Sequence, residues 1–103
     1  MTSLHYDRQR YYREMFIENY LGGDGEVVDR FIVNRGHKDG TELHTITDHG
    51  VIIIRNLYSG KLVTKLVARP QQVKRYYEHT KRHPAESLLA VCREHQEHGF
   101  NNF

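Results

Sequence analysis

Hydrophobic and polar positions follow two different spacings along this chain, one helical and one extended. From Leu4 to Leu21, large apolar side chains recur at steps of three and four residues, and Gly22-Gly23 follows. This spacing predicts an amphipathic helix that ends at the glycine pair. The residues expected on its inward side are Tyr12, Met15, Phe16 and Leu21.

Four short apolar segments separated by turn residues predict four strands. These segments are Val27 to Asn34, Glu42 to Thr47, Val51 to Leu57 and Lys61 to Val67. Connections of about three residues are too short for a parallel crossover, so the strands at these turns should pair antiparallel and form a meander. The unbroken apolar runs in the third and fourth segments indicate that both strands lie near the middle of the sheet.

Two further helices are predicted after the last strand. Pro70 suits the first turn of a helix, and Gln71 to Tyr77 follows it. Pro84 opens a third helix in the same way, with Ala85, Leu88, Leu89 and Cys92 on one face. The predicted fold class is therefore α+β: an N-terminal helix, a four-stranded antiparallel meander sheet and two C-terminal helices.

Length and composition bear on the number of domains and on the cellular compartment. A length of 103 residues predicts one domain, 1–103. A single cysteine excludes an intrachain disulfide and is typical of a reducing compartment. The longest aliphatic run, Val51 to Ile54, is far too short to span a membrane, and the first ten residues lack an apolar signal core. We therefore expect a cytosolic protein with no membrane partner.

Positive charge is concentrated in one part of the sequence. Residues 61–83 contain seven Lys or Arg residues and one acidic residue, Glu78, so their local charge is +6 against +2 for the whole chain. Such a region attracts a polyanion or an acidic protein surface. Alternatively, the basic residues are solvated partners of nearby carboxylates. The predicted partner-binding residues are Lys61, Lys65, Arg69, Lys74 and Arg75.

A histidine–cysteine set near the C-terminus suggests a structural zinc site. His79 and His83 are one helical turn apart, as are Cys92 and His95, and zinc takes four N or S ligands in a tetrahedron. A small domain gains much stability from such an ion. The alternative is that Cys92 is a buried free thiol that packs as a small hydrophobic residue.

A third candidate site lies on the predicted sheet. His44 is on the second strand, and Arg55 and Lys65 are on the strands that follow. A histidine that transfers a proton, with cations beside the phosphate, is what RNA cleavage through the 2′-hydroxyl requires. The sequence does not show whether these three side chains share one face of the sheet.

The segment TDHGVIIIRNLYSGKLVTKLVARPQQVKRYY resembles short proteins carried by phages and integrative elements of Gram-positive bacteria. This resemblance implies an anti-CRISPR inhibitor, which binds a nucleic-acid-loaded type II effector nuclease. The predicted element order is also similar to that of the barnase–colicin–RelE group of ribonuclease toxins, which place catalytic His, Arg, Lys or Tyr side chains on the sheet.

Three hypotheses of function follow from these features. The sequence favours a non-enzymatic inhibitor encoded by a mobile element and directed at a CRISPR effector nuclease. A ribonuclease toxin that uses His44 is the second hypothesis. A small regulator that binds nucleic acid directly, with Gln71 to Tyr77 as its recognition helix, is the third.

Overall fold

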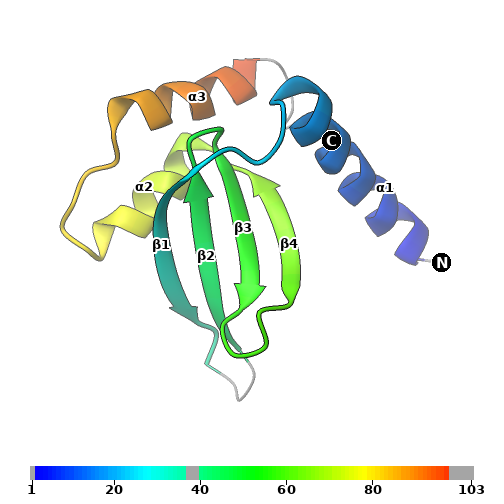
Figure 1. Cartoon of the computed structure of the whole chain (residues 1–103), viewed down its shortest axis with the longest axis horizontal. Helices are drawn as coiled ribbons and strands as arrows, with labels where there is room; N and C mark the ends of the chain where they lie inside the picture. The colour runs from blue at the N-terminus through cyan, green and yellow to red at the C-terminus, as the bar shows by residue number, and fades with distance from the viewer. Residues whose placement is uncertain (1, 37–39, 98–103) are drawn as a thin grey trace.

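The computed structural model describes residues 2–36 and 40–97, with side chains from residue 8 onward. Its elements follow one another in the predicted order (Figure 1). They are α1 (Thr2–Met15), the π-helix η1 (Phe16–Tyr20), β1 (Val27–Asn34), β2 (Thr41–Thr47), β3 (Val51–Asn56), β4 (Leu62–Val67), α2 (Pro70–Glu78) and α3 (Glu86–Glu97). None of the helices among these residues is long and apolar enough to cross a membrane.

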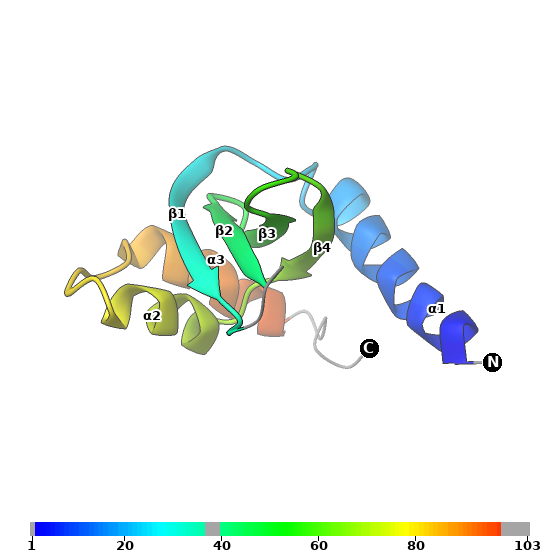
Figure 2. The same ribbon diagram turned by 90° about the horizontal axis from the view of Figure 1, so that it is seen from below.

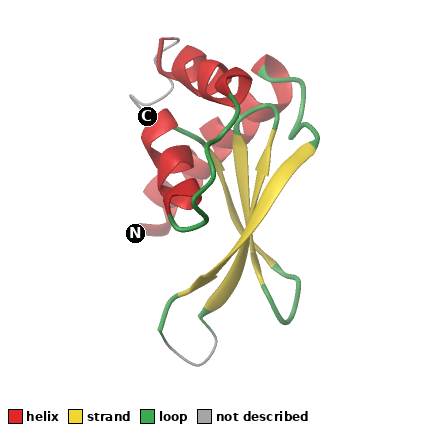
Figure 3. Ribbon diagram, turned by 90° about the vertical axis from the view of Figure 1, so that its left-hand side faces the viewer, coloured by secondary structure: helices red, strands yellow, loops and turns green. Residues whose placement is uncertain are grey.

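The four strands form one antiparallel sheet in the order β1-β2-β3-β4, which confirms the predicted meander and the α+β class. The sheet is strongly twisted (Figure 3). The expectation that both apolar strands lie near the middle is wrong for β4, which is an edge strand. In a meander the last strand has one neighbour, and the first half of β4 accordingly leaves Leu62 and Val63 exposed.

Helices α2 and α3 cover one face of the sheet (Figure 2). The main core lies between them and the strands. On the sheet side it contains Phe31, Ile46, Ile52 and Ile54. The helices contribute Val73, Tyr77, Leu88, Leu89 and Cys92. Burial of these side chains positions α2 along β1 and β2, where the candidate site lies.

The N-terminal helix lies beside β4 and projects away from the sheet (Figures 1 and 2). A second, smaller apolar cluster anchors its C-terminal end, where Ile17 of η1 packs with Val51 and Val67. The predicted inward side of this helix is therefore only partly correct. Phe16 and Leu21 pack against that cluster, whereas Tyr12 and Met15 are 43% and 42% exposed.

Candidate functional site

A groove of about 820 Å³ runs between α2 and the β1–β2 side of the sheet, and we call it the α2 groove. Its apolar floor includes Phe31, Ile54 and Leu66. Polar and charged residues surround this floor. They are Arg30, Arg35, His44, Gln72, Arg75, Tyr76, His79, Thr80 and Arg82. The groove thus combines an apolar surface with two imidazoles, a phenol and several guanidinium groups.

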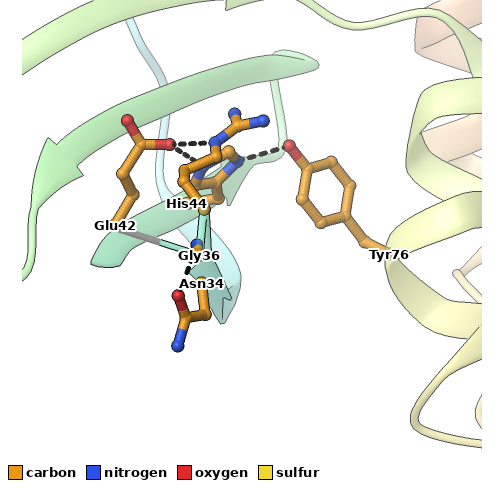
Figure 4. Close-up of polar contacts among 6 residues, drawn as sticks. Asn34, Gly36, Glu42, His44 and Tyr76 are labelled. Atoms are coloured by element: carbon orange, nitrogen blue, oxygen red, sulfur yellow. Dashed lines mark hydrogen bonds and ion pairs between the residues drawn. The ribbon is translucent and has the colours of Figure 1, made fainter. Parts of the chain in front are cut away.

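The polar centre of the groove is a chain of hydrogen bonds through His44 (Figure 4). The Glu42 carboxylate oxygen Oε1 lies 2.9 Å from His44 Nε2 and also accepts a hydrogen bond of 2.9 Å from Arg35 Nε. On the other side of the ring, the Tyr76 hydroxyl lies 2.6 Å from His44 Nδ1. The imidazole is 2% exposed, so its orientation is determined by these two partners.

Strand geometry explains why these groups meet. Side chains two residues apart on a strand point to the same face, which places Glu42 beside His44 on β2. Tyr76 comes from α2, which packs over that face. Arg35 follows β1 in a turn where Gly36 has a φ of 82° and donates its N–H to the Asn34 Oδ1 at 2.7 Å. This turn directs the Arg35 side chain back toward Glu42.

The protonation states follow from the same contacts. The hydrogen bond from His44, together with Arg35, lowers the pKa of Glu42 below its usual value of 4.5 despite partial burial. Burial raises the pKa of Tyr76 above 10.0. Because the ionised Glu42 carboxylate can only accept, Nε2 of His44 donates to it, and in the neutral imidazole Nδ1 is then left to accept the hydrogen bond from the Tyr76 hydroxyl.

A second ion pair forms the end of the groove nearest the α2 C-terminus. Arg82 Nη1 lies 3.0 Å from Asp29 Oδ2, and its guanidinium lies 5.4 Å from the Tyr77 ring centroid and 6.0 Å from that of Phe31. Burial opposes ionisation of Asp29, but hydrogen bonds from the Arg30 N–H and Tyr77, with the Arg82 charge, lower its pKa. Arg82 is thus held in a defined position by a carboxylate and two aromatic rings.

Arg75 is the guanidinium group best placed to bind an anion in the groove. Arg35 and Arg82 are paired with carboxylates, whereas Arg75, on exposed α2 surface, has no carboxylate partner among the described residues. Arg30 also lines the groove from β1, but it pairs in register with Thr45, next to the His44–Phe31 pair, so its side chain leaves the strand on the opposite face of the sheet. The uncompensated charge in the groove therefore comes from α2.

The five predicted partner-binding residues do not form one surface. Lys65 lies on the face opposite His44, and its Nζ is 2.9 Å from Asp24 Oδ2. Lys61 is exposed beyond the N-terminal end of β4, and α2 follows the C-terminal end of that strand. Arg69 is the N-cap residue of α2, and Lys74 and Arg75 are exposed along that helix. Partner binding by these residues stays a prediction.

The proposed zinc ligands occupy two different environments. His79 and His83 are exposed, whereas Cys92 and His95 are buried on α3. Within residues 2–36 and 40–97, no group of three or more His, Cys, Asp or Glu side chains is arranged to hold a metal ion. Burial raises the pKa of Cys92 to about 11, as expected for the packed free thiol that was the alternative. Zinc binding stays a prediction.

The three residues of the predicted nuclease site are not brought together. His44 pairs with Ile54, while Lys65 pairs with Ile53 and therefore lies on the other face. Arg55 sits at a bulge, and its Nη1 donates to the Gly60 carbonyl in the β3–β4 turn. The partners of His44 are Glu42 and Tyr76 instead. The two-residue spacing from Glu42 is a signal that sequence reasoning could have used, but nothing in the sequence indicates the contact with Tyr76.

Comparisons of the chain with protein-family models, with curated proteins and with solved structures gave no match.

Proposed function

We propose that the protein is a ribonuclease that cleaves RNA in the α2 groove through the ribose 2′-hydroxyl. The observation that carries this proposal is the Glu42–His44–Tyr76 hydrogen-bond chain. A carboxylate that orients an imidazole, which in turn accepts a proton from a hydroxyl, is the arrangement that enzymes use to move a proton during nucleophilic attack.

Each residue has a defined role in this reaction. Tyr76 takes the proton of the 2′-hydroxyl while its own proton moves to Nδ1 of His44. Glu42 stabilises the imidazolium that results, because its carboxylate accepts the Nε2 hydrogen bond. The 2′-oxygen attacks phosphorus, the bond from phosphorus to the 5′-oxygen breaks, and the products are a 2′,3′-cyclic phosphate and a 5′-hydroxyl.

Two further residues complete the reaction. Arg75 has no carboxylate partner in the described part of the chain, so it is free to neutralise the phosphate charge that grows in the transition state. His79 is the second imidazole that lines the groove. In its protonated form it returns a proton to the leaving 5′-oxygen. General acid–base groups of this kind typically increase the reaction rate about 10²–10⁴-fold.

The test is cleavage of labelled single-stranded RNA by purified protein. We expect His44→Ala and Tyr76→Phe each to lower the cleavage rate by about 10²-fold or more. Tyr58→Phe is the matched control, because Tyr58 is 77% exposed in the β3–β4 turn and should leave the rate unchanged.

A second substrate separates this mechanism from a contaminating nuclease. A DNA strand of the same sequence lacks the 2′-hydroxyl and should stay intact, and the RNA products should end in cyclic phosphate. Cleavage that persists in both His44→Ala and Tyr76→Phe contradicts the proposal, as does a protein that cuts no RNA at all.

An inhibitor of a CRISPR effector nuclease is the second candidate function. The observation that favours it is the exposed basic surface of α2, formed by Arg69, Lys74 and Arg75, which suits a nucleic-acid-loaded partner. It predicts a stable complex with the nuclease that is lost when these residues are changed to Glu. If the protein is instead a regulator, it should bind nucleic acid without cleaving it. The RNA cleavage assay and a DNA-binding assay together test this third hypothesis.

A further inference from the structure

A second hollow, of about 670 Å³, adjoins the α2 groove at the C-terminal end of α2. We call it the C-terminal hollow. It lies between the end of α2 and the start of α3, and Arg82 lines both it and the α2 groove. Its other lining residues are Lys74, Tyr77, Glu78, Lys81, His83, Pro84, Glu86 and Leu89. A ligand that fills the α2 groove can therefore continue past Arg82 without leaving the surface.

The C-terminal hollow carries uncompensated positive charge. Lys74 and Lys81 are exposed, and neither has a carboxylate partner within ion-pair distance among the described residues. Of the two acidic residues at the hollow, Glu86 is paired with Arg93, which leaves Glu78 as the opposing charge. Together with Arg75 in the neighbouring groove, the two lysines extend a positively charged path around the end of α2.

Lys81 occupies a backbone conformation that favours glycine. Its φ is 56°, and it is the one residue other than glycine with positive φ in the described part of the chain. A side chain in this left-handed region costs about 1–2 kcal/mol. Strained residues cluster at binding and catalytic sites, where a particular side chain is needed at that position. The turn after α2 thus keeps a lysine where glycine is the relaxed choice.

We propose that the C-terminal hollow binds the phosphates of an RNA strand that continues from the α2 groove past Arg82. This inference rests on the proposed function for the identity of the ligand. It adds that the substrate is a single strand of several nucleotides rather than a dinucleotide, because Lys74 and Lys81 reach phosphates that a dinucleotide lacks. Lysine binds phosphate as a point charge, without reading the base.

The test compares a single-stranded RNA decanucleotide with a dinucleotide. The variant combines Lys74→Gln with Lys81→Gly, because glycine relieves the left-handed strain and Lys74 is exposed on the helix surface. We expect the ratio of kcat/KM for the long over the short substrate to fall about tenfold, which corresponds to about 1.4 kcal/mol. The control, Arg8→Gln on α1, should keep the wild-type ratio.

Binding measurements separate this inference from the proposed function. In the His44→Ala background, the double lysine variant should reduce the slope of log affinity against log salt by about 1.4 for the decanucleotide, which corresponds to two lost phosphate contacts. If wild-type protein cleaves neither substrate, the proposed function fails, and this slope still tests the hollow. An unchanged ratio or an unchanged slope overturns the inference, as does a protein that binds no RNA.

Discussion

Gly50 in the turn between β2 and β3 allows the sharpest test of the packing against the C-terminal half of α3. Its φ is +75°, and a Cβ atom at this position would lie 2.6 Å from His95 Cε1 and 3.3 Å from Val91 Cγ1. The His95 ring has little room to move, because it is 2% exposed and packs edge-on against Phe16 at 5.9 Å. Gly50→Ala should therefore combine backbone strain with a steric clash.

The expected loss of stability can be divided between these two effects. The left-handed backbone costs alanine about 1–2 kcal/mol, and overpacking of a core costs about 1–3 kcal/mol more. Gly60→Ala is the matched control, because Gly60 has a φ of +73° but no atom within 4 Å of the added methyl group. The difference of about 1–3 kcal/mol between the two variants is the steric contribution of His95 and Val91.

Thermal unfolding followed by circular dichroism measures this difference. At about 4–8 °C per kcal/mol for a domain of this size, the steric contribution of about 1–3 kcal/mol should make Gly50→Ala melt about 4–24 °C below Gly60→Ala. In a His95→Ala background most of the clash is removed, so adding Gly50→Ala should then cost little more than Gly60→Ala. Equal melting temperatures for the two single variants would refute the close contact between Gly50 and His95.

Three further predictions concern buried residues of α3 and the predicted zinc site. Burial lowers the pKa of His95 below 6.5. The free energy of unfolding is therefore highest above pH 6.5 and falls as the pH drops toward the folded-state pKa, because the unfolded chain binds the proton more readily. In His95→Leu the free energy of unfolding should depend less on pH between pH 7 and 5. Since burial raises the pKa of Cys92 to about 11, a maleimide should label the native protein slowly and the denatured protein fully, and rapid native labelling would contradict the burial. If the predicted zinc site exists, elemental analysis should find about one zinc per chain and a chelator should lower the melting temperature; metal-free protein with an unchanged melt would reject it.

Local patterns along the sequence were sufficient to predict most of the fold. Short apolar segments separated by turn residues predict the four antiparallel strands, and β1 matches its predicted bounds of Val27 to Asn34. Pro70 correctly indicates the start of α2. These features depend on neighbours in the chain, because apolar runs, turn residues and the fixed φ of proline act within a few residues.

The position of β4 and the environment of α1 depend on the tertiary structure. An apolar run shows that a strand is buried somewhere, but not which neighbours cover it, so β4 was placed near the middle although it is an edge strand. The helical spacing of Tyr12 and Met15 likewise indicates an apolar stripe but not a surface against which it packs. In the folded protein the anchoring contacts of that region come from Phe16, Ile17 and Leu21.

The candidate site shows the same division between sequence and tertiary structure. The order of residues identified His44 as a candidate on a predicted strand and showed that positive charge is concentrated in residues 61–83, because both can be read from neighbouring positions in the chain. The partners of His44 come from β2 and from α2, and residues 44 and 76 are 32 positions apart. Only the packing of α2 on the sheet brings the Tyr76 hydroxyl to the imidazole, and the strand register places Lys65 on the opposite face. The sequence determines which chemical groups are available, whereas the packing of the helices and strands that carry them determines which distant side chains come into contact.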